Sequence, residues 1–332
     1  MAGRIAVVGA GIAGIACARR LQDGGRDVEL FEKSRGVGGR VATRRVSFGD
    51  LASSFDHGAQ FLTARGDDFR AATRRWLDAG VVSAWSERFC RWSRSSVLPM
   101  NGEDRLVGIP TMTALPKALA VGLALHLDTT VTGLVRQGRQ WWLQAPAGRA
   151  AGPFDAVVLA VPGEQAEPLL RPVSRSLADD AARSIIGPCW AGMFAFESSF
   201  DPGYDAARIE SGGPIGWMAR EFSKPGRRDA HAWTVHATPE WSAQMLESSP
   251  QTVSRSLEDA LRELVPSATR VRGAAVHRWR YAQVTAAVGS AFGWDGSLRL
   301  GTCGDWRLGP RVELAWQSGD ALGAALLCEG GR

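Results

Sequence analysis

The sequence predicts an α/β protein in which a helix-covered parallel sheet is interleaved with an α+β domain built on a mixed or antiparallel sheet. Two observations support this fold class. Residues 4–32 show the pattern strand, helix, strand that is typical of a βαβ unit. Residues 298–327 return to strand, loop and helix, so we expect the first domain to be completed at the C-terminus.

The first element is the apolar strand beginning at Ile5, followed by a helix over Ile12–Gln22 and a strand ending at Phe31. Residues 33–49 are rich in Gly and Arg and predict a loop. Amphipathic spacing then predicts a helix over Phe69–Ala79.

Pro116–Leu123 is expected to start a third helix, with its proline at the first helical position. Alternation over 125–144 indicates hairpins, and the apolar run 154–162 indicates a buried strand that ends in a turn. The middle of the chain mixes short strands, at 193–196 and 233–236, with a clear helix over Thr252–Leu264.

Composition excludes several classes of protein. The net charge of the 332 residues is +5. Nearly all the positive charge is carried by arginine, and the Arg doublets are far apart. No nucleic-acid-binding module is indicated, so the arginines are expected on a solvated surface, with some of them steering a phosphate-bearing small molecule. Five scattered cysteines suggest neither a disulfide framework nor a metal site. No apolar run is long enough to span a membrane and no signal peptide is evident, so we expect a cytoplasmic protein.

A dinucleotide-binding motif opens the chain. Gly9, Gly11 and Gly14 form G-x-G-x-x-G between the first strand and helix, which lets a pyrophosphate approach bare backbone at a helix N-terminus. Glu32 ends the second strand, where a carboxylate can accept hydrogen bonds from both ribose hydroxyls.

Two further segments concern the identity of the dinucleotide. Ser34 to Arg40 contains Gly38-Gly39-Arg40, which places bare backbone and a guanidinium beside the phosphates. Gly304-Asp305-Trp306 precedes the C-terminal helix, where Asp305 can hold a ribityl hydroxyl and the helix end can face a flavin.

Together these segments resemble the glutathione-reductase-type FAD fold of the flavin amine oxidase superfamily, and most closely its renalase branch. The resemblance spans almost the whole chain. Its blocks are Lys33-Ser34-Arg35-Gly36 with Gly38-Gly39-Arg40, Asp56 with Gly58 to Arg65, Trp76 with Gly80 and Trp85, His277 to Ala282, and Gly304-Asp305-Trp306 with Arg311-Val312-Glu313, Trp316 and Ser318-Gly319.

The resemblance implies non-covalent FAD and a discontinuous FAD-binding domain (1–65, 100–165 and 276–332) interleaved with a substrate domain (66–99 and 166–275). With the glycine motif, the expected cofactor-binding residues are Gly9, Gly11, Ile12, Gly14, Glu32, Lys33, Gly39, Arg40, Gln60, Phe61, Val131, Gly304, Asp305, Arg311 and Val312. The expected substrate-binding residues are Phe61, Leu62, Thr63, Ala64, Arg65, Trp190, Trp217, Tyr281 and Trp306.

Several of these residues have a second interpretation. The aromatic candidates Trp190, Trp217, Tyr281 and Trp306 also suit a hydrophobic core. Arg65 suits either a substrate phosphate or a surface salt bridge. His57 suits a flavin neighbour, a covalent tether or an ordinary hydrogen-bonded loop residue. The chain departs from the family pattern at Phe61, where Tyr is expected, and at Val284, where Pro is expected.

The activity implied by the resemblance is oxidation of the 2- and 6-dihydro isomers of NAD(P)H to NAD(P)+, with O2 reduced to H2O2. A dihydropyridine is already a hydride donor, so no catalytic acid or base is assigned. Amine oxidases usually add a lysine near the flavin, and none of Lys33, Lys117 and Lys224 is an obvious candidate. The alternatives are an amine oxidase, a desaturase and a non-catalytic flavin sensor. The sequence distinguishes neither NAD from NADP nor any oligomeric state.

Overall fold

The computed structural model describes residues 3–85, 88–93, 96–100, 102, 104–146, 150–210, 212–228 and 231–329. The chain forms two compact units. Unit 1 comprises residues 1–40, 115–186 and 284–332, and unit 2 comprises residues 41–114 and 187–283. These boundaries differ from the expected domain segments, because residues 41–65, 100–114 and 276–283 pack in unit 2 and residues 166–186 pack in unit 1.

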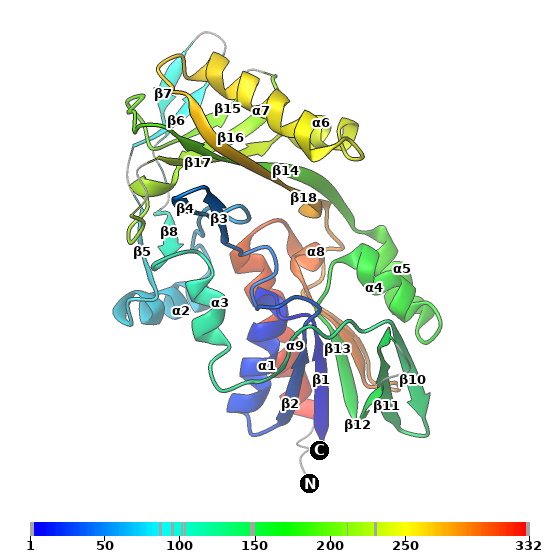
Figure 1. The fold of residues 1–332 in the computed structure, drawn as a ribbon. Helices are drawn as coiled ribbons and strands as arrows, with labels where there is room; N and C mark the ends of the chain where they lie inside the picture. Colours follow the sequence, from blue (N-terminus) through cyan, green and yellow to red (C-terminus); the bar gives the residue numbers. More distant parts are fainter. Residues whose placement is uncertain are drawn as a thin grey trace. The chain divides into compact units, whose positions relative to one another are not determined.

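Unit 1 is built on a six-stranded sheet with the order β19-β20-β13-β1-β2-β9, parallel except for β19. A three-stranded antiparallel sheet, β10-β11-β12, packs beside it (Figure 1). The strands of the unit are β1 (Arg4–Val8), β2 (Asp27–Phe31), β9 (Ala124–His126), β10 (Gly133–Gln137), β11 (Gln140–Gln144), β12 (Ala150–Phe154), β13 (Ala156–Leu159), β19 (Gly293–Asp295) and β20 (Leu300–Thr302).

Helices α1 and α9 pack closely on this parallel sheet (Figure 1). A Cβ added at Gly319 of α9 would lie 1.9 Å from the carbonyl oxygen of Ala13 in α1, so the contact requires glycine. The helices of the unit are α1 (Ile12–Asp23), α3 (Ala114–Leu119), α4 (Gly163–Leu170), α5 (Arg175–Arg183), α8 (Asp305–Leu308) and α9 (Val312–Glu329).

Unit 2 is built on a seven-stranded mixed sheet with the order β18-β14-β17-β16-β15-β6-β7. The pairs β14-β17, β17-β16, β16-β15 and β6-β7 are antiparallel, and β15 and β6 are parallel. Two short antiparallel pairs, the hairpin β3-β4 and the pair β5-β8, complete the strands. Their bounds are β3 (Arg44–Phe48), β4 (Leu51–Phe55), β5 (Val82–Ala84), β6 (Phe89–Trp92), β7 (Val97–Pro99), β8 (Leu106–Gly108), β14 (Ile185–Phe196), β15 (Ala206–Ile209), β16 (Ile215–Arg220), β17 (Ala232–Ala237) and β18 (Val271–Ala286).

Helices α6 and α7 cover one face of the mixed sheet (Figure 1). Val253, Leu257 and Leu261 lie at helical spacing along α7 and are fully buried against the sheet. The helical elements of unit 2 are α2 (Asp67–Asp78), η2 (Glu221–Ser223), α6 (Pro239–Gln244) and α7 (Pro250–Leu264).

The predicted fold class is confirmed, because a largely parallel sheet and a mixed sheet occupy separate units. The prediction of a loop throughout 33–49 was wrong, because residues 44–48 form β3. Val46 and Phe48 alternate with polar residues in this strand and pack on a small apolar cluster. Pro116 is the third residue of α3 and not its first, a position where its missing N–H is still not needed. The strand expected from residue 154 begins at Ala156, since Phe154 ends β12.

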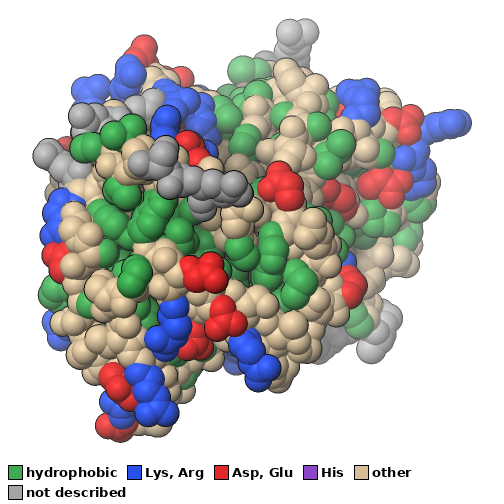
Figure 2. Space-filling view, turned by 90° about the horizontal axis from the view of Figure 1, so that it is seen from above, with side chains coloured by type: hydrophobic (Ala, Val, Ile, Leu, Met, Phe, Trp, Pro, Cys, Tyr) green, Lys and Arg blue, Asp and Glu red, His purple; other side chains and the backbone are tan. Residues whose placement is uncertain are grey.

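Charged side chains of both signs are interspersed on the face seen in Figure 2. Among the described residues, no helix combines the length and apolarity needed to cross a bilayer.

Candidate cofactor and donor sites

The glycine motif of unit 1 forms a cradle with space for a ligand. Gly11 is the N-cap of α1, and no side chain caps the helix, so its first amide groups are open to an anion. A Cβ at Gly11 would meet no atom within 4 Å, whereas one at Gly14 would lie 1.9 Å from the carbonyl oxygen of Gly9. Gly11 therefore leaves room for a pyrophosphate, and Gly14 allows helix and strand to pack.

Glu32 is fixed at the end of β2 by two backbone donors. Its carboxylate accepts hydrogen bonds from Ala10 N and Ser34 N, both at 2.9 Å. Each oxygen of an ionised carboxylate has two lone pairs, so both oxygens can still accept from a ribose hydroxyl. This arrangement fits the ribose of a dinucleotide.

The second glycine segment lies beside the first. Gly38 N donates to Ala10 O at 2.8 Å and Gly38 bridges to Gly11, while Gly38 and Gly39 have φ values of 119° and 54°. These left-handed conformations favour glycine, so the bare backbone predicted at this position is required by the turn.

Two charged pairs stand near the start of the C-terminal helices. Arg40 Nη2 lies 2.5 Å from Asp305 Oδ1, so the two predicted cofactor residues meet across 265 positions of sequence. Arg311 pairs with Glu313 at 3.2 Å at the beginning of α9, where Val312 is the first helical residue. Gly304, with φ of 154°, precedes α8 and donates its N–H to Ser318 Oγ at 2.9 Å.

The other unit 1 candidates have simpler surroundings. Ile12 is buried, Val131 is half-buried in the loop before β10, and Lys33 is exposed with Nζ 3.4 Å from Gln165 Oε1. Trp306 is fully buried and its indole N–H donates to Val161 O at 3.0 Å. This is the placement of a core aromatic residue.

The residues of unit 1 therefore fit FAD. The orphaned amides of α1, the open space at Gly11 and the anchored Glu32 suit its pyrophosphate and adenosine ribose, while Arg40 and Asp305 supply further polar groups.

Unit 2 holds an aromatic cluster made by Phe61, Trp85, Phe89 and Trp217. The Phe61 ring centroid lies 5.6 Å from that of Trp217 and 6.2 Å from that of Trp85, and Trp85 meets Phe89 at 4.8 Å. The guanidinium carbon of Arg105 lies 4.2 Å from the Phe89 centroid and 5.6 Å from that of Phe61. Such a cluster provides flat apolar surfaces with a cation beside them.

Two of the predicted aromatic substrate residues have different surroundings in this unit. Trp190 is buried in the core beneath α7 and donates its indole N–H to Met245 O at 3.0 Å, so it has the placement of a core residue. Tyr281 is half-buried on β18.

The predicted substrate segment 61–65 connects to β8. Leu62 is buried and exchanges two backbone hydrogen bonds with Leu106, at 2.8 and 2.9 Å. Thr63 and Ala64 are half-buried, and Arg65 is exposed.

A buried cluster of four charged residues, which we call the charge cluster, was not predicted. It consists of Asp56, Glu221, Lys224 and Arg227. The Lys224 ammonium has no exposed surface and lies 3.3 Å from Asp56 Oδ2 and 3.0 Å from Glu221 Oε2. The Glu-x-x-Lys spacing of 221 and 224 was a local signal, but Asp56 is far away in sequence.

The pKa values of the two carboxyl groups in the charge cluster are shifted in opposite directions. Burial alone would raise the pKa of Asp56, but the charges of Lys224 and Arg227 outweigh it and lower the pKa to about 2. Burial raises the pKa of Glu221, and Lys224 only partly offsets this effect. Asp56 therefore stays ionised to lower pH than Glu221 does.

Gln60 is held by the charge cluster. Its Oε1 accepts from Lys224 Nζ at 3.1 Å, and its Nε2 donates to the carbonyl oxygens of Asp56 and Gly58. Both N–H groups of the amide are therefore used, and the second lone pair of Oε1 and the backbone are what Gln60 can still offer a cofactor.

Three histidines, His57, His236 and His277, lie close together in unit 2. The His57 ring stacks on Trp279 at 5.0 Å and meets His277 edge-on at 4.8 Å, and its carbonyl oxygen accepts from Trp279 and His236. Burial, reinforced by the nearby His277 and His236, lowers the pKa of His57 to about 3. Burial likewise lowers the pKa of His236 to about 4. These imidazoles are neutral at physiological pH.

This histidine group predicts acid sensitivity. Because the pKa of His57 is lower in the folded state than in the unfolded state, its contribution to stability is present above pH 6.5 and is lost as pH falls toward 3. We expect the free energy of unfolding to decrease through His57 alone by about 1.4 kcal/mol per pH unit at most. The variant His57→Phe keeps a ring against Trp279. In urea unfolding between pH 5 and 6.5, its free energy of unfolding should depend on pH less steeply than that of the wild type, by up to about 1.4 kcal/mol per pH unit, the equivalent of one proton. An unchanged slope would show that His57 does not cause the sensitivity.

Two family models match the chain, and each match includes residues of both units. An NAD(P)-binding Rossmann-like domain matches residues 7–77, and the family described as flavin containing amine oxidoreductase matches residues 72–294, about two thirds of the chain.

Solved structures share the fold over nearly full length. Cyclohexylamine oxidase from Brevibacterium oxydans IH-35A has a TM-score of 0.77 at 14% identity and covers 100% of both chains. A candidate protoporphyrinogen oxidase from Exiguobacterium sp. 255-15 has a TM-score of 0.78 at 12% identity, and putrescine oxidase bound to putrescine has 0.73 at 13%, each covering 99% of both chains. The fold, the cradle that fits FAD and the family match together identify the chain as a member of the flavin containing amine oxidoreductase family, an FAD-dependent oxidoreductase.

Proposed function

We propose that this protein is an oxidase of renalase type, which oxidises the 2- and 6-dihydro isomers of NAD(P)H to NAD(P)+ and reduces O2 to H2O2. The reaction balances as NAD(P)H isomer, O2 and one proton giving NAD(P)+ and H2O2. FAD held non-covalently by the glycine cradle and Glu32 would supply the hydride acceptor, at flavin N5, and the route by which the electron pair reaches oxygen.

The observation that carries this proposal is the position of Lys224. It is the one lysine of unit 2 in the sequence, and its ammonium is enclosed by Asp56, Glu221 and Gln60 with no exposed surface. Lys33 is exposed beside Gln165 and Lys117 is exposed on α3. The Lys224 ammonium is therefore committed to two carboxylates and an amide, with the Trp85 ring 5.2 Å away, and this favours a donor that needs no free lysine.

The surroundings of segment 61–65 support the same class of donor. The rings of Phe61 and Trp217 offer apolar surfaces against which a flat dihydropyridine can be oriented. In this proposal the residues of unit 2 orient the donor and exclude water, and no residue transfers a proton.

Oxidation of an amine is the second candidate, because the family and two of the structures of similar fold are named for it. The aromatic cluster would also suit a neutral amine. Product analysis distinguishes the two candidates.

The proposal predicts the products formed in air. With a mixture of 2- and 6-dihydro-NADH, the protein should form NAD+ and H2O2 in equal amounts, and ordinary 4-dihydro-NADH and benzylamine should yield neither. If peroxide formed only with amines, the protein would be an amine oxidase and the proposal would be wrong. Acid precipitation should release all of the FAD, whereas flavin retained by the precipitate would contradict non-covalent binding.

A further inference from the structure

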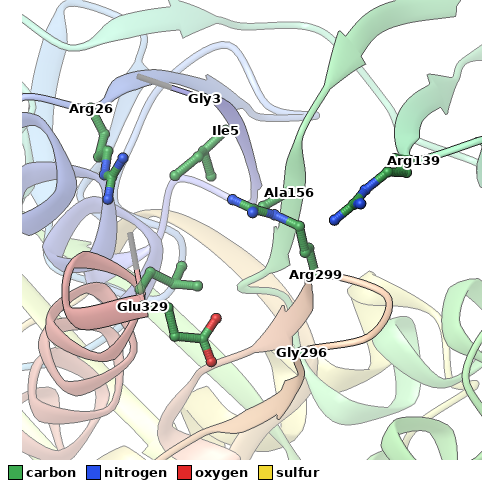
Figure 3. Close-up of a pocket in the computed structure, with 9 residues that line it drawn as sticks. Gly3, Ile5, Arg26, Arg139, Ala156, Gly296, Arg299 and Glu329 are labelled. Atoms are coloured by element: carbon green, nitrogen blue, oxygen red, sulfur yellow. The ribbon is translucent and has the colours of Figure 1, made fainter. Parts of the chain in front are cut away.

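A small cavity lies in unit 1 at the amino-terminal ends of the sheet strands. Its volume is about 120 Å³, and Figure 3 shows that its walls come from separate segments of the chain. Ile5 of β1 and Ala156 of β13 contribute apolar surface. The cavity is much smaller than the roughly 300–1,000 Å³ of pockets for drug-sized ligands, so its size suits a small group.

Three arginines line this cavity. Arg26 precedes β2, Arg139 lies in the turn between β10 and β11, and Arg299 precedes β20 (Figure 3). Within the part of the chain that the structure describes, none of the three guanidinium groups donates a hydrogen bond or forms an ion pair. The one acid in the lining, Glu329, accepts from the indole N–H of Trp294 at 2.7 Å. The lining therefore carries an excess of positive charge.

The turn between β19 and β20 brings Arg299 to the cavity. Its φ is 56°, a left-handed conformation at the last residue of the turn 296–299 that joins the two antiparallel strands. Arg139 and Arg299 are exposed and Arg26 is half-buried, so an anion would reach the three guanidinium groups from solvent.

We propose that this cavity is a binding site for a phosphate-type oxyanion. Guanidinium groups recognise such anions through paired hydrogen bonds, and the three found here have no other acceptor among the described residues. The site is separate from the cofactor motif, because Gly3 and Gly9 flank opposite ends of β1, about 15 to 20 Å apart at the usual rise per residue. The source is either free phosphate or the phosphate of a small metabolite.

Calorimetric titration of the flavin-loaded protein tests this site. With ionic strength held constant by chloride, inorganic phosphate should bind saturably at one site per chain. Arg299→Gly and Arg139→Gln should each weaken binding roughly tenfold or more, since each removes a charged hydrogen-bond donor. Arg45→Ala, which removes an exposed arginine of unit 2, should leave binding unchanged. Equal affinity in wild type and both cavity variants, or no binding beyond chloride, would overturn the proposal.

Two further arms make the result specific. Arg299→Gly relieves the left-handed strain, so its unfolding temperature should not fall, and loss of binding then reports on the guanidinium. Glycerol phosphate that binds as well as phosphate supports a metabolite phosphate, whereas binding of phosphate alone supports the free ion.

Discussion

Replacing Lys224 by Met is expected to lower the free energy of unfolding by about 3–5 kcal/mol at pH 7, the usual cost of removing one partner from a buried ion pair. The ammonium is the group within 3.3 Å of both Asp56 and Glu221, so its removal leaves two buried carboxylates with Arg227 alone. Urea unfolding of the two proteins at pH 7 measures the difference.

Two comparisons make this expectation specific to the charge cluster. Lys117→Met removes an exposed lysine from α3 and should change stability by no more than about 0.5 kcal/mol. Adding Glu221→Gln to Lys224→Met removes the carboxylate whose pKa burial already raises, so the double variant should recover part of the loss. If Lys224→Met is as stable as Lys117→Met, the cluster does not stabilise unit 2 as described.

Alanine at Gly14 and at Gly11 should both abolish or weaken FAD binding, for different reasons. At Gly14 the new Cβ would stand 1.9 Å from the carbonyl oxygen of Gly9, which forces α1 and β1 apart and costs about 1–3 kcal/mol of overpacking. At Gly11 the Cβ meets no protein atom within 4 Å and instead occupies the space left for the pyrophosphate.

The two variants therefore separate folding from cofactor binding. We expect Gly14→Ala to be less stable and to purify without flavin. Gly11→Ala should fold with a loss of no more than about 1 kcal/mol, since Ala is a poorer N-cap than Gly, and bind FAD roughly tenfold or more weakly. Gly36→Ala is the matched control, because its Cβ also meets nothing within 4 Å, and it should retain FAD. Full flavin occupancy in Gly11→Ala would show that the dinucleotide does not approach this glycine.

The sequence predicted those parts of the fold and site whose signals are local. The glycine motif and Glu32 lie within one βαβ unit, so spacing alone placed them, and the long periodic helices α1, α7 and α9 were found within a few residues. The short strand β3 was missed, because its five residues follow a glycine-rich segment and alternate only weakly.

The charge cluster was missed for a different reason. Asp56 and Lys224 are 168 residues apart, and no pattern near either one indicates that the fold will bring them together. Local sequence also gave no means of separating Trp306 and Trp190, which lie in cores with their indole N–H groups bonded, from Trp217, which joins the aromatic cluster.

The central claim, oxidation of misreduced dihydronicotinamides by a bound flavin, is tested most directly by mixing the oxidised protein anaerobically with NADH isomers and following the flavin absorbance. Our account predicts rapid bleaching by the 2- and 6-dihydro forms, no bleaching by 4-dihydro-NADH or benzylamine, and H2O2 when air is readmitted. No bleaching by the isomers would contradict it, and bleaching by benzylamine alone would assign the flavin to amine oxidation.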